Sequence, residues 1–424
     1  MKVVHLNTSD VGGAGIAAKN LHLALLEKNI ESTFVSKFQL GDTFRAHEIL
    51  KSSEANWFVP RLYEKVKKSA LSRLKLDESI ESYYLKGHSN QYEHFSFPWS
   101  DLEPETLNSI AEADIIHLHW ISDGFIDPRK IFKFQNRKFV WTLHDMNPFT
   151  GGCHHNDGCE KFENNCNYCY QLNGTRNEYL SYSILKYKYE ALRDIASDQL
   201  NVVTPSIWLG NLSKKSAILK RFDHHVIRNM NAFDGSDINV NGLKQKHKID
   251  EKETVFIFVA HHFDNPRKGI SILMQALEAL NDQNIKVIAI GEKNDSFLKH
   301  DKIIQFGYVK DKTILKELYT LADAFILPSK AENFPNTIVE SLLCGTPVIA
   351  SNVGGISEQI TAENGLLVNL MDVEDWKQKL TWFIANKQKF DRSAIKQKAK
   401  QDYNNETIVE QHIKLYEQLL KKQA

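Results

Sequence analysis

The chain has 424 residues, of which 42% are hydrophobic and 25% are charged, the composition of a globular protein large enough for two domains. Lysine plus arginine equals aspartate plus glutamate at 53 each, and this balance argues against a general nucleic-acid-binding surface. No apolar stretch reaches the roughly 18 residues that span a membrane, and the first apolar run leads into polar residues without a signal-peptide pattern, so we expect a cytoplasmic protein.

The first half of the chain alternates short apolar runs with stretches of helical character. The runs that we expect to form strands are residues 3–6, 32–35, 114–119, 138–143, 201–204 and 225–227. Strands and helices in alternation are typical of a doubly wound parallel sheet. The pattern therefore predicts one Rossmann-like domain over residues 1–228.

A second alternating series follows the polar, turn-rich residues 229–250, which we interpret as a linker. Its expected strands are residues 254–259, 286–290, 303–306, 324–327 and 348–350. The series predicts another Rossmann-like domain over residues 251–400 and a C-terminal helix within residues 401–424. The predicted fold class is thus α/β, with two doubly wound domains facing across a cleft, a usual place for a ligand.

The most informative segment is a strand-to-helix turn that carries two glutamates with seven residues between them. The apolar residues 324–328 are short enough for a buried parallel strand, so Glu332 lies at the carboxyl end of a strand, where open α/β sheets bind ligands. Pro335 suits a first helical turn, whose N–H groups favour an anion. Glu340 lies about one turn further along. Two carboxylates beside an anion-binding helix start suit a sugar attached to a diphosphate, although the spacing alone would fit two ordinary surface glutamates.

This segment resembles the donor-binding motif of retaining glycosyltransferases with the GT-B fold. Further motifs occur in the order expected for that family, at residues 12–15, 141–146, 148–154, 264–269, 345–350 and 353–355. Each motif alone has a simpler interpretation as a turn or a surface charge, but together they cover most of the chain. The chain is identified as resembling glycosyltransferase family 4, the glycosyl transferases group 1 type, and its middle motifs are similar to a branch that builds bacterial surface polysaccharides.

The resemblance implies a donor site with two cations. Lys268 and its neighbour Arg267 would neutralise the leaving diphosphate. Relatives usually carry arginine six residues before the lysine, where this chain has His262, so the second cationic role falls to either Arg267 or His262. The residues expected to bind the donor are Gly13, Ala14, His262, Arg267, Lys268, Asn333, Phe334, Pro335, Thr337 and Glu340.

The resemblance also implies three catalytic residues, His144, Glu332 and Lys268. His144 follows an expected strand, and in the family a histidine at this place touches the donor sugar; His119, near the end of the preceding strand, could also reach the cleft. Glu332 and the N–H groups of the residues after it would position the sugar, and Glu340 would bind the ribose. A histidine at a strand end is also commonly a structural residue.

The expected reaction is transfer of a hexose-type sugar from a UDP- or GDP-linked donor to a saccharide or lipid-linked acceptor. The resemblance implies retention of configuration by front-face attack, in which the departing phosphate takes the acceptor proton. No D-x-D triplet occurs in the chain, which predicts catalysis without a metal. The alternatives are a nucleotide-sugar epimerase or hydrolase of the same fold and a non-catalytic sugar-nucleotide-binding subunit.

Four of the five cysteines fall in one polar loop, residues 151–170. They are Cys153, Cys159, Cys166 and Cys169. Disulfides are disfavoured in the cytoplasm, and the C-x2-C pair suits two thiolates on one metal, so we expect a structural zinc ion, with His154 or His155 as a substitute ligand. The alternative is four reduced cysteines.

Two segments bear on the partners of the protein. Residues 61–76 combine many basic side chains with a loose apolar stripe, which fits a helix on an anionic membrane, where lipid-linked acceptors reside, or a solvated helix covering the first domain. By family resemblance, a last helix at residues 407–421 would cross back to the first domain.

Overall fold

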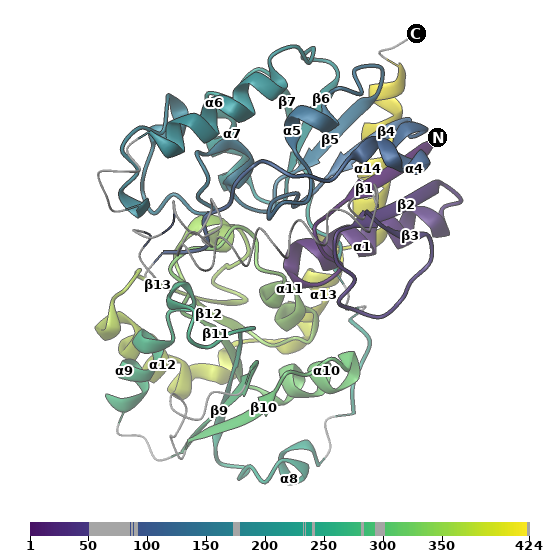
Figure 1. Cartoon of the computed structure of the whole chain (residues 1–424). Helices are drawn as coiled ribbons and strands as arrows, with labels where there is room; N and C mark the ends of the chain where they lie inside the picture. The colour runs from purple at the N-terminus through teal and green to yellow at the C-terminus, as the bar shows by residue number, and fades with distance from the viewer. Residues whose placement is uncertain are drawn as a thin grey trace, which may run out of the picture. The chain divides into compact units, whose positions relative to one another are not determined.

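A computed structural model describes residues 1–50, 85, 88, 92–172, 179–231, 233, 235–239, 242–280, 284–292 and 302–421 (Figure 1). The chain folds as two compact units. The first contains Met1–Thr204, Gly210–His225 and Ile413–Ala424, and the second contains Pro205–Leu209 and Val226–His412. The last helix, α14 (Asn405–Lys421), begins in the second unit and ends in the first. The expected basic helix at residues 61–76 lies outside the described residues.

The first unit is built on a seven-stranded sheet in the order β3-β2-β1-β4-β5-β6-β7. Its strands are β1 Lys2–Leu6, β2 Glu31–Ser36, β3 His47–Ile49, β4 Ile115–Leu118, β5 Lys138–Thr142, β6 Leu200–Thr204 and β7 Asp223–Val226. Neighbours from β3 to β6 pair in parallel, and β4, β5 and β6 are buried along their whole length, as apolar runs in a covered parallel sheet should be. The strand order reverses between β1 and β4, the position at which such sheets bind ligands.

Helices connect these strands (Figure 1). They are α1 Gly12–Glu27, α4 Asn108–Ala111, α5 Pro128–Ile131, α6 Leu180–Leu192 and α7 Ile207–Lys215. The α1 helix begins a few residues after β1, and the end of α14 packs on the same sheet, since Tyr416 bonds to His117 of β4.

The second unit is built on a six-stranded parallel sheet in the order β10-β9-β8-β11-β12-β13. Its strands are β8 Thr254–Val259, β9 Ile285–Ile290, β10 Ile303–Gly307, β11 Ala324–Leu327, β12 Val348–Ser351 and β13 Gly365–Val368. Its helices are α8 Leu243–Lys246, α9 Ile270–Glu278, α10 Lys312–Leu321, α11 Asn336–Leu343, α12 Val373–Asn386, α13 Arg392–Asp402 and the start of α14. One continuous apolar core joins the sheet to these helices. These two parallel sheets with their helices confirm the predicted α/β fold class of two Rossmann-like domains.

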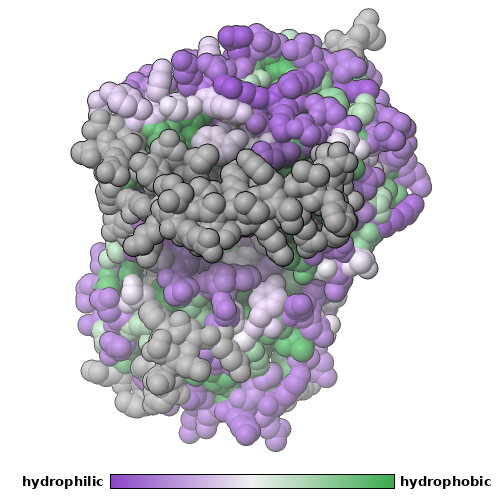
Figure 2. All heavy atoms as spheres, in the orientation of Figure 1, coloured by the Kyte–Doolittle hydropathy of each residue, from purple (hydrophilic) through white to green (hydrophobic). Residues whose placement is uncertain are grey.

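The strand order of the second sheet reverses between β8 and β11. The loops that leave these two strands therefore meet at a ligand-binding position. On the face drawn in Figure 2, hydrophilic residues cover most of the coloured surface. Within the described ranges, no helix combines the length and the apolar character needed to cross a membrane.

Candidate active site

Two loops at the reversal of the second sheet carry the predicted donor-site residues. The loop after β8 ends in a short 3-10 helix, Pro266–Lys268, and the loop after β11 contains Glu332. The backbone N–H of Lys330 donates to the carbonyl of Arg267 at 2.7 Å. Gly269 has φ +67°, and a Cβ there would lie 1.9 Å from the carbonyl oxygen of Pro328. Only glycine fits this contact, which locks the two loops together.

The carboxylate of Glu332 lies between both predicted cations. Its Oε1 is 2.8 Å from Nη1 of Arg267 and 2.7 Å from Nζ of Lys268, and it accepts a hydrogen bond from Ser329 at 3.0 Å. The three charged side chains are mostly buried, with exposed fractions of 11% for Glu332, 17% for Arg267 and 20% for Lys268. Charge-assisted hydrogen bonds of this kind offset the cost of burial. The cluster carries one positive charge more than the carboxylate neutralises, which suits an anionic ligand.

Two glycines, Gly354 and Gly355, lie close against the backbone of the loop that carries Glu332. A Cβ at Gly354, whose φ is +56°, would lie 1.8 Å from the carbonyl oxygen of Glu332, and one at Gly355 would lie 2.0 Å from that of Asn333. The N–H of Gly355 also donates to the Glu332 carbonyl at 3.3 Å. The glycine motif at these positions therefore serves to place Glu332, a role that no local sequence pattern indicates.

The residues after Glu332 lead into α11. The side chain of Asn333 accepts a hydrogen bond from Ser206 at 2.5 Å, and the ring of Phe334 is buried beneath the guanidinium of Arg228 at 4.6 Å. Pro335 caps the helix, and Thr337 lies in its first turn. The side chains of Asn333 and Phe334 thus anchor the loop, which leaves ligand contact to the backbone of this segment.

His262 takes a different position from the two cations. Its Nδ1 lies 2.5 Å from Oε2 of Glu292, and its side chain is 55% exposed. Arg267, by contrast, shares the Glu332 carboxylate with Lys268. Of the two alternatives for the second cationic role, this geometry favours Arg267.

Glu340 is half-buried on α11, and burial raises its pKa to about 7. The hydroxyl of Tyr319 donates to its Oε2 at 3.1 Å, which favours the ionised form and opposes the effect of burial. Tyr319, on α10, was absent from the sequence-based site, because nothing in the local sequence indicates that its hydroxyl meets a carboxylate on another helix.

The raised pKa of Glu340 predicts a pH dependence of stability. An acid that holds its proton more tightly when folded favours the folded state most below its ordinary pKa of 4.5, and this advantage is lost as pH rises through about 7. As pH rises from 5 to 8, the melting temperature of Glu340→Gln should therefore increase relative to that of the wild type, which loses the advantage of the protonated acid. Parallel melting profiles for the two proteins would contradict the raised pKa.

The glycine loop of the first unit opens α1. Gly12 requires glycine for its φ of +75°, and Gly15 because a Cβ would lie 2.6 Å from the carbonyl oxygen of Ser9. A Cβ at Gly13 would meet no described atom within 4 Å, so packing does not require glycine there. Gly13 and Ala14 thus form the part of the turn in which a ligand could approach the backbone.

His144 follows β5, and its neighbour Asp145 anchors the turn. Asp145 accepts hydrogen bonds from Trp120 at 2.7 Å and from the N–H of Asn147 at 2.8 Å, and it pairs with His154 at 2.7 Å. Although burial raises the pKa of Asp145, His154 and the N–H of Asn147 hold it at about 2, whereas burial lowers the pKa of His144 to about 4. His144 is therefore a neutral imidazole at physiological pH, a hydrogen-bond donor or acceptor and not a cation.

Ser96, His154 and Asp145 reproduce the connectivity of a nucleophilic triad. Oγ of Ser96 is 2.8 Å from Nε2 of His154, whose Nδ1 faces Asp145. Ser96 is buried, however, and its hydroxyl donates to Asp123 at 2.8 Å. This network is structural, and it fixes the segment that carries His144.

A cluster of buried histidines lies beneath His144. In the part of the chain that the structure describes, His5, His117 and His119 are the group of potential metal ligands whose ligand atoms all lie within 4.8 Å of one another. His119 contacts both His5, at 3.1 Å, and His144, at 3.2 Å. The sequence pointed to His117 and His119 by their alternation but missed His5, which stands opposite His117 on the adjacent strand.

Three of the four clustered cysteines, Cys153, Cys166 and Cys169, have thiols whose pKa is raised. Burial raises the pKa of the Cys166 thiol to about 11 and also raises that of Cys169, and the neighbouring thiols add to both shifts. Backbone N–H groups oppose these shifts, from Gly151 toward Cys166 and from Gln171 and Leu172 toward Cys169. No three of the four sulfur atoms all lie within 4.8 Å of one another, so the cysteine side chains, all among the described residues, do not form a tetrahedral set of metal ligands in this arrangement.

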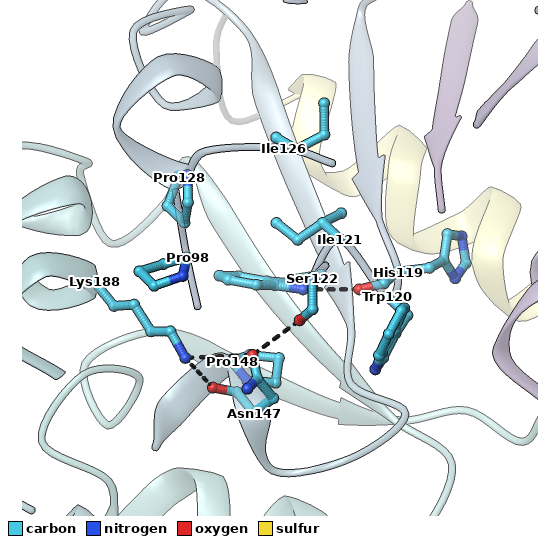
Figure 3. A pocket seen from close by; sticks show the side chains of 11 residues that line it. Pro98, His119, Trp120, Ile121, Ser122, Ile126, Pro128, Asn147, Pro148 and Lys188 are labelled. Atoms are coloured by element: carbon cyan, nitrogen blue, oxygen red, sulfur yellow. Dashed lines mark hydrogen bonds between the residues drawn. The ribbon is translucent and has the colours of Figure 1, made fainter. Parts of the chain in front are cut away.

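An indentation of the first unit lies beside this region (Figure 3). Its cavity of about 20 Å³ has room for roughly one water molecule. Lys188, on its wall, donates to the carbonyl and side-chain oxygens of Asn147 at 2.5 Å and 3.3 Å, and Ser122 donates to the same side chain at 2.9 Å (Figure 3). These contacts bind Lys188 to the turn after His144, and the space is too small for a sugar.

Comparison with known proteins finds similarity to glycosyl transferases, both over the second unit and over nearly the whole chain. Residues 240–402 match the family model of glycosyl transferases group 1. The putative colanic acid biosynthesis glycosyl transferase WcaC of Escherichia coli is 22% identical over 96% of this chain and 97% of its own. The D-inositol 3-phosphate glycosyltransferase of Rhodococcus jostii is 31% identical, over 34% of this chain and 35% of its own.

Solved structures share the fold over nearly the full length. HepE of Anabaena, in complex with UDP and glucose, superposes with a TM-score of 0.62 at 17% identity, covering 99% of this chain and 100% of its own. WaaG, a glycosyltransferase involved in lipopolysaccharide biosynthesis, superposes with a TM-score of 0.61 at 14% identity, covering 98% and 99%. Residues 240–402 thus form a domain of the glycosyl transferases group 1 type, and the chain as a whole has the GT-B fold of two parallel-sheet domains and is similar over nearly its full length to a glycosyl transferase of polysaccharide biosynthesis.

Proposed function

We propose that the protein moves a hexose-type sugar from a nucleoside diphosphate sugar to a saccharide or lipid-linked acceptor, with retention of configuration, in surface polysaccharide biosynthesis. The cluster of Glu332 with Arg267 and Lys268, at the reversal of the group 1 sheet, carries this proposal. Relatives support it by their names, since WcaC is named for colanic acid biosynthesis and HepE was crystallised with UDP and with glucose.

The donor would be held by residues with distinct tasks. Lys268 and Arg267 bind the diphosphate, aided by the N-terminus of α11 after Pro335. Glu332 and the backbone of the segment after it receive the sugar hydroxyls. Glu340, held by Tyr319, accepts the ribose hydroxyl hydrogens when it is ionised.

The reaction would need no protein nucleophile. The acceptor oxygen forms its bond to the anomeric carbon on the face from which the diphosphate leaves, and a phosphate oxygen takes the acceptor proton. The chain stabilises the leaving diphosphate through its cations and orients the sugar through Glu332 and His144, while Gly13 and Ala14 offer their backbone. We propose catalysis without a metal, because no D-x-D triplet is present.

Incubation with a panel of UDP- and GDP-linked hexoses tests the proposal. Nucleoside diphosphate should be released from one donor only when saccharide or lipid-linked acceptors are added, and the new bond should keep the donor's anomeric configuration by NMR. Conversion of the donor without acceptor would indicate an epimerase or hydrolase. Binding of a donor with no turnover under any acceptor would indicate a binding subunit.

We further propose that the cysteine loop binds one structural zinc ion. Four thiols near one another, with backbone N–H groups directed at two of them, form a donor set that zinc prefers, and zinc would offset the repulsion between thiolates. A closed site of four ligands leaves no position for substrate, so the ion would order the loop and take no part in the chemistry.

Cys169→Ser should remove the zinc and lower the melting temperature. Cys344→Ser is the matched control, since Cys344 is also partly buried but lies outside the loop. Elemental analysis should give about one zinc per chain for the wild type and the control, as expected for one site, and the wild type should keep its activity after brief EDTA treatment. Metal-free wild-type protein with four titratable loop thiols and full stability would exclude the site.

A further inference from the structure

We propose that His119 and His5 are positioning residues that fix the tautomer and ring orientation of His144. The consequence for catalysis rests on the function proposed for His144 above, whereas the coupling among the three histidines does not. The inference comes from a continuous line of imidazoles that runs from the interior of the first sheet to the end of β5.

The sheet brings the three rings together. His5 lies in the buried part of β1, His119 directly follows the neighbouring strand β4, and His144 follows the next strand, β5. Nδ1 of His5 lies 3.1 Å from Nε2 of His119, and Nδ1 of His119 lies 3.2 Å from Nε2 of His144. Successive rings are stacked with centroids 5.4 Å apart. In Figure 3 the His119 ring points away from the side on which Lys188 lies.

The nitrogen–nitrogen distances restrict how the protons are distributed among the three imidazole rings. A nitrogen–nitrogen contact of this length is a hydrogen bond, which needs one N–H and one bare nitrogen. A neutral imidazole has one of each, so the choice at one ring dictates the choice at the next. A charged imidazole has two N–H groups and would remove this coupling. His5 and His119 are buried, at 0% and 2% exposure, and burial disfavours the charged form. The tautomer of His144 is therefore coupled to those of His119 and His5, with Nε2 as the nitrogen that takes part in the line.

A metal is a less suitable occupant of this cluster. Both nitrogens of His117 already have partners, Tyr416 at Nδ1 and Thr142 at Nε2, each at 2.7 Å. A metal bound by His5, His117 and His119 would have to break one of these bonds as well as one of the two bonds of His119, to His5 or to His144. The ring nitrogens of His117 thus form a separate hydrogen-bonded branch of the cluster, through Tyr416 and Thr142, although its ring stacks on that of His119 with centroids 4.1 Å apart.

That branch supplies a matched control. His119→Phe keeps a buried aromatic ring and removes both nitrogen contacts of the line, whereas His117→Phe makes the same change two residues earlier on the same face of β4. Both variants should lose stability. Only His119→Phe should disturb His144, and His119→Asn, whose amide can replace the Nδ1 group, should restore part of the effect.

Nitrogen-15 NMR of the imidazoles in the whole protein, without any donor, tests the coupling. His144, assigned with His144→Gln, should show one tautomer in the wild type and in His117→Phe, and a mixed or reversed tautomer in His119→Phe. An unchanged His144 signal in His119→Phe would overturn the proposal, as would about one tightly bound metal per chain that is lost on replacing His5.

Kinetics connects the coupling to catalysis. His119→Phe should lower kcat at least tenfold with little change in the KM of the donor, and His117→Phe should leave kcat within about twofold of the wild type. If the NMR coupling is present but His144→Gln retains full activity, the role proposed for His144 fails while the positioning line stands. If the coupling is absent and His144→Gln is inactive, the positioning line fails while the role proposed for His144 stands.

Discussion

Replacing Glu332 by glutamine should lower the rate of sugar transfer by about 10²- to 10³-fold, the effect of removing one well-placed electrostatic group from an active site. Glutamine keeps the size of the side chain and one acceptor oxygen but loses the negative charge. That charge faces two cations, Arg267 and Lys268, at 2.8 Å and 2.7 Å. The variant should therefore lose sugar positioning and leave the two cations repelling each other.

The same contacts predict a cost in stability, which the sequence alone did not suggest. Removing the carboxylate from a mostly buried ion pair should cost about 1–3 kcal/mol, less than for a fully buried pair. Because the two cations then lack their counter-ion, UDP or GDP should stabilise Glu332→Gln more than it stabilises the wild type. Thermal shifts with each nucleotide measure this difference.

Glu253→Gln is the control for this substitution. Glu253 is exposed to a similar extent, 15% against 11%, and pairs with Lys286 in the same unit, away from the cation cluster. It should lose some stability without losing activity. Near wild-type turnover in Glu332→Gln would remove Glu332 from the proposed mechanism, whatever the stability of the variant.

The sequence predicted the central strands and one edge strand of each sheet, β7 and β10, and missed the other edge strand of each. The unpredicted strands are β3, with the polar sequence His47–Ile49, and β13, which begins at Gly365. A central parallel strand is covered on both faces and must be a continuous apolar run, so it can be recognised locally. The two missed edge strands are partly exposed and owe their conformation to pairing with one neighbour, and neither a polar segment nor a short run that opens on glycine identifies a strand by itself.

The same distinction applies to the site. The loop that carries Glu332 was predictable, because a buried strand followed by a helix start is a local pattern. The contact of Glu332 with Arg267 and Lys268 joins residues 64 or more positions apart in the chain and follows from the adjacency of β8 and β11. The approach of His5 to His119, over 114 positions, likewise depends on strand order and not on any local spacing.

Replacing Lys268 by alanine should weaken binding of the nucleoside diphosphate by about 10- to 150-fold, because a hydrogen bond to a charged group contributes about 1.5–3 kcal/mol. The fold should tolerate this change better than the loss of Glu332. In Lys268→Ala the carboxylate of Glu332 keeps Arg267 and Ser329 as partners, so no buried charge is left alone. Isothermal titration with UDP and with GDP measures the affinity directly.

Arg267→Ala and His262→Ala decide which residue supplies the second cation. Arg267 also donates to the carbonyl of Ala331 at 2.8 Å, so its loss should weaken nucleotide binding and loosen the Glu332 loop together. His262 is exposed and paired with Glu292, so its loss should change affinity by less than about threefold, within the small contribution of exposed ion pairs. Unchanged affinity for both nucleotides in Lys268→Ala, with a large loss in His262→Ala, would move the diphosphate away from the Glu332 cluster and contradict the proposed donor site.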